Sequence, residues 1–267
     1  MKGLRIYAVA YLVFLYAPIV LLPVFAFNAS TIIAFPLSGF TFEWFIELGE
    51  TGALHAAVKN SLFIACLTAV FSTLLGICAA RAGAKYDFPG KRGILGLIMV
   101  PLVLPEIIVG VSLLVVVVNL LDWPLSSWTV IAAHVLICTP FSIAILNGAF
   151  QNMDASLEEA AQDLGETPLA TFRLVTLPLV MPGIISSLLI SFTISLDEFI
   201  IAFFLTGAEP TMPVYIWGLL RFPQKIPTVM ALGTLLVLAS ILLLTIAELM
   251  RRRGLKRAGL KDTGGFL

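Results

Sequence analysis

Three carboxylates lie inside stretches that are otherwise apolar: Glu106, Asp197 and Glu198. A charge at the centre of a membrane-spanning helix costs at least about 2.5–3.5 kcal/mol unless it is paired or hydrated. No lysine or arginine lies deep in an apolar stretch of this chain. The balancing cation must therefore come from a ligand, a partner subunit or water, or the acids are protonated. An acidic cavity of this kind would suit a flexible di- or polycation.

Helix geometry predicts how these acids are arranged. Glu106 is 13 residues past Gly93, and Asp197 is 15 residues past Pro182. At 1.5 Å per residue these distances are about 20 and 22 Å from the inner face, so both acids could face one cavity. Neighbours on a helix diverge by about 100°, so we expect one of Asp197 and Glu198 to face the cavity and the other to face a helix. The alternative is a purely structural role, in which the acids pair with a partner subunit or bind backbone freed by prolines.

Other side chains offer less chemistry. Trp44 could form a cation–π wall of the cavity, although anchoring at the membrane interface is the alternative. The chain contains no G-x-x-x-x-G-K-[ST] motif, no Ser/His/Asp set and no metal-ligand spacing, so we predict neither an enzyme nor a metal site. Cys66, Cys78 and Cys138 stand alone in apolar runs and are expected to be buried small hydrophobes.

Composition identifies the setting of these residues. Of 267 residues, 60% are hydrophobic and 12% are charged, whereas soluble domains average about 45–50% and about 25%. This excludes a soluble enzyme, a nucleic-acid binder and a disordered protein. The formal net charge of zero points to no polyanionic partner. We predict an all-α integral membrane protein.

Six stretches approach the about 20 apolar residues that a membrane span needs. They cover roughly residues 7–27, 60–80, 93–121, 129–150, 178–207 and 227–250. The first follows Lys2 and Arg5 like a signal peptide, but its apolar run exceeds the roughly 7–15 residues of such a segment, so we expect it to be retained. We predict one transmembrane domain over 1–267, with its core bundle at about 56–250.

Loop charges predict the orientation. With the N-terminus inside the cell, only Lys59, Arg221 and Lys225 of the 16 basic residues lie outside, which leaves 13 inside. Both termini are therefore predicted to be cytoplasmic.

The inner loop at 151–177 is too long for a simple connection. Ser156 and Glu159 have the spacing of a capping box, and Gly165 stands where a left-handed residue would end a helix. Thr167 and Pro168 then have the types preferred at the N-cap and first position of a second helix. We expect two short helices separated by a bend at Gly165, the second ending near Thr176 before Pro178 opens the next span.

The first of these helices has a narrow apolar stripe bordered by acids. The stripe comprises Leu157, Ala160, Ala161 and Leu164, and the acids are Glu158, Glu159 and Asp163. Such a helix either packs on its own bundle or lies in a groove of another protein. The spacing alone favours neither.

This loop resembles the EAA loop of binding-protein-dependent ABC importer permeases. Glu159-Ala160-Ala161, Gly165 and Val175-Thr176-Leu177-Pro178 match the pattern E-A-A-x3-G-x9-I-x-L-P, with Val175 in place of Ile. The resemblance implies a type I importer permease fold, in which this loop docks in a cytoplasmic ATPase. It assigns that contact to Glu158, Glu159, Ala160, Ala161, Asp163, Gly165, Leu177 and Pro178, with Glu159 as the main contact and Gly165 as the bend.

Further stretches resemble the spermidine/putrescine branch of these permeases. They are Leu15–Val20, Ala53–Gly76, Phe88–Arg92, Pro101–Gly110 and Ser195–Phe199. The resemblance implies a bacterial inner-membrane protein that imports a polyamine-like cation; permeases for opines, amino-acid derivatives and phosphonates are the alternative. It also implies a second related permease, two ATPase subunits that bind ATP and Mg²⁺, and an extracytoplasmic solute-binding protein, with no cofactor in this chain.

Prolines within the spans could serve in gating. Pro101 and Pro105 precede Glu106, and Pro182 precedes Gly183; each proline removes a helix hydrogen bond. We consider these four positions hinge candidates, with simple packing kinks as the alternative. The rival function is a secondary transporter whose carboxylates carry protons or sodium, but no inverted repeat is detectable. A membrane enzyme or assembly factor is disfavoured because no catalytic set is present.

Overall fold

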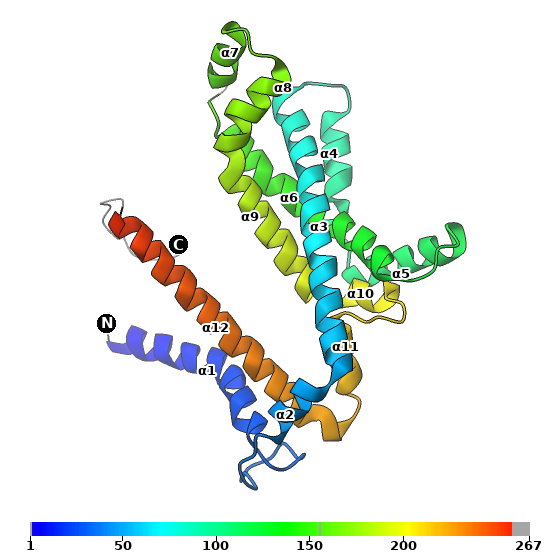
Figure 1. Ribbon diagram of the computed structural model, residues 1–267, viewed down its shortest axis with the longest axis vertical. Helices are drawn as coiled ribbons and strands as arrows, with labels where there is room; N and C mark the ends of the chain where they lie inside the picture. The colour runs from blue at the N-terminus through cyan, green and yellow to red at the C-terminus, as the bar shows by residue number, and fades with distance from the viewer. Residues whose placement is uncertain (1, 155, 258–267) are drawn as a thin grey trace. The chain divides into compact units, whose positions relative to one another are not determined.

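The computed structural model describes residues 2–154 and 156–257, whose regular structure is helical apart from an isolated bridge between Asn28 and Phe40 (Figure 1). The chain divides into two compact units. One comprises Met1–Gly52 with Ile216–Leu267, and the other is Ala53–Tyr215. Among the described residues, five helices are long and apolar enough to cross a membrane, or up to six if one bent pair counts as a single span. The all-helical, multi-span class predicted from composition is confirmed.

The first unit is built around two long helices. α1 (Lys2–Ala26) and the short α2 (Glu43–Glu50) both pack against α12 (Ile226–Arg257). Leu22 lies beside Gly233, and Glu47 on α2 pairs with Lys225 and Thr228. The 3-10 turn η4 (Pro223–Lys225) precedes α12, and α11 (Met212–Leu219) crosses the boundary between the units.

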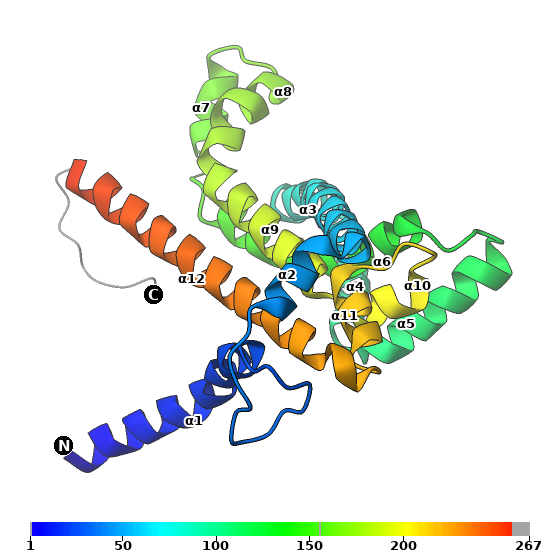
Figure 2. The same cartoon turned by 60° about the horizontal axis from the view of Figure 1, so that its bottom comes forward.

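The second unit has α3 (Gly52–Lys85), α6 (Ser127–Gln151) and α9 (Leu177–Asp197) at its centre, where they run side by side (Figure 1 and Figure 2). Small residues let these helices approach closely: a Cβ added to Gly76 would lie 2.6 Å from Ser142, and one added to Gly183 would lie 2.6 Å from Ala149. Hydroxyl groups bond across the helices, as between Ser142 and Ser191 at 3.0 Å. The hinge candidate Gly183 therefore lies at a tight helix contact.

The third predicted span is broken. α4 (Lys91–Met99) and the 3-10 turn η1 (Val100–Leu102) meet α5 (Glu106–Val115) and the π-helical turn η2 (Val116–Leu120) at a bend of 102°. Pro105 is the N-cap of α5 and has no N–H to continue the helix. The span over 93–121 is therefore broken at the prolines, and the depth of Glu106 that was calculated from a straight helix is wrong.

The fifth span begins and ends earlier than expected. α8 (Pro168–Thr171), the π-helical turn η3 (Phe172–Thr176) and α9 form one span over Pro168–Asp197. Pro178 cannot donate to the fourth carbonyl before it, and the wider π turn directly precedes it. The predicted end of a separate helix near Thr176 is wrong, because the helix continues into the membrane. After α9 the backbone is extended at Glu198, and α10 (Ile200–Leu205) follows.

The cysteines differ in exposure. Cys138 is buried as expected, whereas Cys66 and Cys78 are exposed on this chain, so the expectation of burial is wrong for those two. An apolar side chain at the lipid-facing surface of a membrane protein carries no hydration penalty, which makes such exposure compatible with the predicted setting.

Candidate functional site

The inner loop folds as the short helix α7 (Ser156–Asp163), whose C-terminal end was predicted correctly. Gly165 has φ of +92°. The Gly165 N–H donates to Gln162 at 2.9 Å and the Glu166 N–H to Ala161 at 3.1 Å, which together form a Schellman motif. Thr167 caps the next turn by accepting from the Ala170 N–H at 3.3 Å.

The N-terminal end of α7 differs from the prediction. Ser156 is the first helical residue instead of the N-cap, and its N–H donates to the Asp154 carboxylate at 3.0 Å. Hydrogen bonds from the Ser156 side chain and backbone lower the pKa of Asp154. The expected capping box of Ser156 and Glu159 is thus displaced, because a carboxylate two residues earlier takes the capping role.

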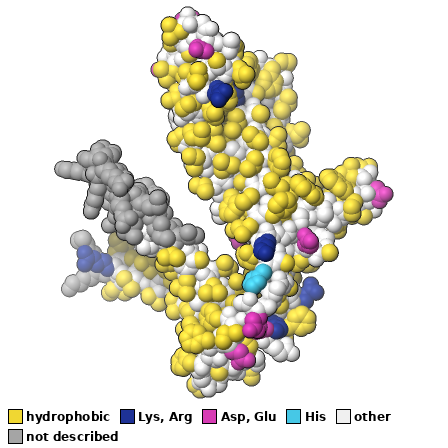
Figure 3. All heavy atoms as spheres, in the orientation of Figure 1, with side chains coloured by type: hydrophobic (Ala, Val, Ile, Leu, Met, Phe, Trp, Pro, Cys, Tyr) yellow, Lys and Arg dark blue, Asp and Glu magenta, His cyan; other side chains and the backbone are white. Residues whose placement is uncertain are grey.

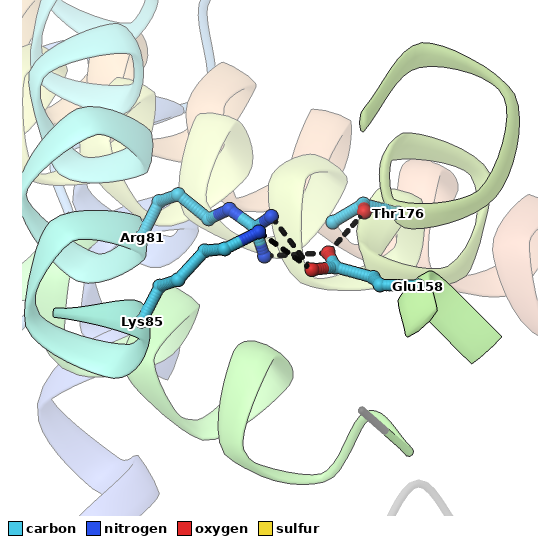
Figure 4. Close-up of polar contacts among 4 residues, drawn as sticks. All are labelled: Arg81, Lys85, Glu158 and Thr176. Carbon is cyan, nitrogen blue, oxygen red and sulfur yellow. Dashed lines mark hydrogen bonds and ion pairs between the residues drawn. The ribbon is translucent and has the colours of Figure 1, made fainter. Parts of the chain in front are cut away.

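The two adjacent acids of α7 point in different directions. Glu159 is exposed, whereas Glu158 is buried and faces α3 and η3. Arg81 approaches the Glu158 carboxylate at 2.6 and 2.9 Å, Lys85 approaches it at 3.2 Å, and the Thr176 hydroxyl donates to it (Figure 4). Glu158 therefore anchors α7 to its own chain, while Glu159 is free for another partner.

The charge state of Glu158 follows from these contacts. Burial alone would raise the pKa of Glu158, but the hydrogen bonds from Arg81, Thr176 and Lys85 and the charge of Arg81 outweigh it and lower the pKa to about 2. The carboxylate is therefore ionised at neutral pH and forms a charge-assisted, forked contact with the Arg81 guanidinium.

Arg81 is itself held between aromatic rings. Its guanidinium carbon lies 5.8 Å from the ring centre of Phe150, at the end of α6, and 5.7 Å from that of Phe172, at the start of η3. Both distances are within cation–π range. Arg81, Lys85 and Thr176 were not predicted as site residues, although basic residues four apart at the end of a span signal a shared helix face.

The rest of α7 and the following turn present apolar and acidic groups outward. Leu157 is 45% exposed and Leu164 is 87% exposed. Glu159, Ala160 and Asp163 are also exposed, and Ala161 is half-buried. Figure 3 shows hydrophobic and charged side chains together at this end of the second unit. Within the described chain, the predicted apolar stripe of α7 thus remains uncovered at both leucines. Of the two other loop residues assigned by the resemblance, Leu177 is half-buried and Pro178 is exposed.

The intramembrane acids form a second cluster. Glu106 begins α5 and Asp197 ends α9, and both are exposed. Glu198 is buried, and its carboxylate accepts the Ile201 N–H at 2.9 Å at the start of α10. The charges of Glu106 and Asp197 both act on Glu198, and α5 packs on α10 where Gly110 meets the Phe204 ring.

The acid cluster, which comprises Glu106, Asp197 and Glu198, has no cationic side chain paired with it among the described residues. In the described part of the chain, none of its three carboxylates forms an ion pair with lysine or arginine. The described residues also include no group of three or more histidine, cysteine or acidic side chains placed to hold a metal ion. Protein carboxylates that have no cationic side chain beside them are suited to bind an organic cation.

Trp44 belongs to the first compact unit, and the acid cluster belongs to the second. Its indole N–H donates to the Asn28 carbonyl at 2.8 Å, which ties α2 to the loop after α1. Among the hinge candidates, Pro101 lies in η1 and Pro105 lies at the 102° break, while Pro182 is inside α9.

Relatives of known class share most of this chain. Residues 72–256 match the family described as binding-protein-dependent transport system inner membrane component. The putrescine transport system permease protein PotI of Escherichia coli K12 is 37% identical over 259 residues, covering 92% of each chain. The spermidine/putrescine transport system permease protein PotC of the same strain is 32% identical over 240 residues, covering 90% of each.

Solved structures share the fold. A chain of a bacterial ABC transporter involved in import of the acidic polysaccharide alginate aligns with a TM-score of 0.70 at 16% identity, covering 94% of this chain and 98% of that one. A chain of a bacterial alginate ABC transporter, in complex with an alginate pentasaccharide-bound periplasmic protein, also gives 0.70, at 22% identity and 91% coverage of each. The chain belongs to the family of binding-protein-dependent transport system inner-membrane components: it is an ABC importer permease subunit, a multi-pass transport component of the bacterial inner membrane and not an enzyme.

Proposed function

We propose that this chain forms half of the membrane pathway of an ATP-driven importer for a polyamine-like cation. The observation that carries this proposal is that Glu106 begins α5, which packs on α10, while Asp197 and Glu198 lie at the junction of α9 and α10. None of the three acids has an ion pair with lysine or arginine among the described residues. The putrescine and spermidine/putrescine permeases to which the chain is 37% and 32% identical support the same ligand class.

The three acids have different roles in this proposal. Asp197 and Glu106 are exposed and contact the ammonium groups of the ligand, whereas Glu198 caps α10 and holds the two other acids in register. Separated carboxylates match a ligand with separated positive charges, and the low dielectric of the membrane strengthens each contact. Trp44 is retained as a candidate aromatic wall of the pathway, supported only by its aromatic character.

In this proposal, α7 is the element through which ATP hydrolysis by a partner subunit drives the permease. Both termini and the loop 151–177 lie in the cytoplasm, in agreement with the excess of basic residues on that side. Glu159, Ala160 and Asp163 face outward with the two exposed leucines and dock in a groove of a P-loop ATPase, which binds ATP and Mg²⁺. Gly165 sets the bend, and Leu177 and Pro178 set the entry into the span.

The complete transporter contains a second, related permease, two copies of the ATPase and an extracytoplasmic solute-binding protein. Closure of the ATPases moves α7, and the spans rock so that the acid cluster opens first to the outside and then to the cytoplasm. The break at Pro105 with Pro101, and the kink at Pro182 beside Gly183, are the pliable positions.

The test is ATP hydrolysis by the reconstituted complex with its binding protein. Putrescine, spermidine, an opine, an amino-acid derivative and a phosphonate are compared as ligands. We expect stimulation by the polyamines, and its loss in Asp197→Asn and Glu106→Gln while the complex still assembles. Stimulation by a neutral or anionic ligand alone, or by polyamines regardless of both substitutions, would refute the cationic pathway. Uptake without any ATPase, driven by a proton or sodium gradient, would favour a secondary transporter.

A further inference from the structure

α7 has few means of holding its own position. It is eight residues long, and isolated helices shorter than about 12–15 residues are marginal in water. It packs on α8 and η3, but Leu157 at its start and Leu164 just beyond its end remain exposed. The placement of α7 against the long helix α3 therefore depends on specific side-chain contacts.

Those contacts converge on the Glu158 carboxylate. One oxygen meets Arg81 at 2.6 Å and the Thr176 hydroxyl, and the other meets Arg81 at 2.9 Å and Lys85 at 3.2 Å. Arg81 and Lys85 lie one turn apart on α3, whereas Thr176 ends η3 (Figure 4). A single side chain thus joins α7 to two elements that continue into the membrane.

α3 continues from this point to the opposite end of the second unit. It is one helix of 34 residues. Near its beginning, the Asn60 side chain donates to the Glu209 carbonyl at 2.7 Å, and the Ser61 hydroxyl accepts the Met212 N–H at 2.7 Å. A displacement of α3 at Glu158 would therefore reach the loop before α11, which the loop-charge count places on the outer side.

We infer that Glu158 is a positioning residue that links α7 to α3 and η3, so that movement of the ATPase-facing helix becomes movement of the spans. This inference rests on the proposed function, and it divides the adjacent acids: Glu159 faces the ATPase, and Glu158 transmits the motion. A buried ion pair is suited to this role because separation leaves an uncompensated buried charge. An apolar contact could slide, but the forked contact with Arg81 fixes direction as well as distance.

The experiment compares Glu158→Gln with Glu166→Gln in the reconstituted transporter. Both substitutions remove one negative charge from the same loop, but Glu166 is exposed and its side chain forms no hydrogen bond or ion pair among the described residues. The first readout is hydrogen exchange of the α7 amides without ligand. We expect it to rise about tenfold or more in Glu158→Gln, as loss of a charged hydrogen bond would produce, and to stay unchanged in Glu166→Gln.

The second readout is the amount of ligand transported per ATP hydrolysed. In Glu158→Gln we expect the amount of ligand moved per ATP hydrolysed to fall about fivefold. The milder substitution Arg81→Lys keeps one charged contact with Glu158. Its amount of ligand moved per ATP should lie between those of wild type and Glu158→Gln. A purely structural role would reduce transport and hydrolysis together, and this result would overturn the inference. Unchanged exchange and an unchanged ratio would overturn it as well.

The failure of the proposed function has a different signature. If polyamines do not stimulate hydrolysis, the proposed ligand is wrong, but the exchange measurement needs no ligand and still tests the link. If the wild-type permease does not bind an ATPase at all, the proposed energy source is wrong whatever Glu158 does.

Discussion

Glu158 and Glu198 are buried acids of the same compact unit, and their carboxylates have different partners. Glu158 meets two cations and a hydroxyl at the loop end of α3. Glu198 meets a backbone N–H at the start of α10, with two further acids acting on it. The charge of Glu158 is neutralised within the chain, whereas Glu198 has no cationic partner among the described residues and binds a backbone N–H.

In the proposed function, this difference corresponds to a positioning site at Glu158 and a ligand site near Glu198. Around Glu158 the formal charges of Arg81 and Lys85 exceed that of the carboxylate by one, so the group is complete without a ligand. Glu198 has two further acids near it, Glu106 and Asp197, whose charge the proposed external cation would balance. The same kind of charge-changing substitution should therefore have different effects on stability and ligand binding at the two sites.

The largest effect is expected from Arg81→Glu. It replaces the forked contact with like-charge repulsion at a buried carboxylate, and breaking a buried pair costs about 3–5 kcal/mol. The control is Lys91→Glu, which reverses the same charge at the exposed pair with Asp87 and should cost less than about 1 kcal/mol. Thermal unfolding of the purified subunit measures both. Equal losses would mean that the Glu158 site is no more coupled to the fold than a surface pair.

Acidification should weaken the contacts of Glu158 with Arg81 and Lys85. The pKa of Glu158 is lowered from 4.5 to about 2, which corresponds to about 3 kcal/mol. Because the folded-state pKa is depressed, this stabilisation is fully present above about pH 4.5 and is lost as the pH falls toward about 2. The charged groups that face Glu158 are Arg81 and Lys85.

The measurement is the protection of the α7 amides across that pH range, corrected for intrinsic exchange. Wild type should lose protection on acidification, and Glu158→Gln should lose less, because only the contribution of Asp154, which accepts the Ser156 N–H of α7 and also has a lowered pKa, remains. Hydrogen bonds from Lys225 and Thr228 also lower the pKa of Glu47, which lies in the other unit. The difference between wild type and Glu158→Gln isolates the α7 site. If Glu158→Gln lost as much α7 protection with acid as wild type, the transition would be assigned to another group.

At the ligand site, Asp197→Asn should affect binding without affecting the fold. The side chain is exposed and ends α9, so its loss removes a charged contact to the ligand but leaves no buried group unpaired. We expect the polyamine concentration for half-maximal stimulation to rise about tenfold, or about 1.4 kcal/mol. Asp87→Asn, the same change at an exposed acid of the loop end, is the control. An unchanged concentration in Asp197→Asn would remove this acid from the pathway.

Local signals made the C-terminal half of the inner loop predictable. Gly165, Thr167 and Pro168 act through backbone geometry within a few residues, so their types and order determine the bend without reference to the rest of the chain. The same applies to the apolar spans, because length and composition decide whether a helix can cross a membrane.

The remaining features depend on distant residues. The sequence could not show that Glu158 turns inward and Glu159 outward, because the deciding partner, Arg81, lies 77 residues earlier. Pro105 signalled a bend or a break, but the 102° angle depends on how α5 packs against α10. Likewise, Glu198 is distinguished from Asp197 by the N–H of Ile201, which is available only because a new helix begins there.

The smallest effect should come from Glu198→Gln, and it is the most direct test of the comparison. Glutamine keeps a carbonyl oxygen that can accept the Ile201 N–H, so the cap at α10 survives, and we expect a loss of less than about 1 kcal/mol in thermal unfolding. Glu198→Ala removes the acceptor and should cost about 1–2 kcal/mol. If Glu198→Gln proved as costly as Arg81→Glu, the charge of Glu198 would itself be essential to the fold and would need a cationic partner. Since the described chain supplies none, that partner would have to belong to the second permease, and the acid cluster would be part of a subunit interface instead of a ligand site.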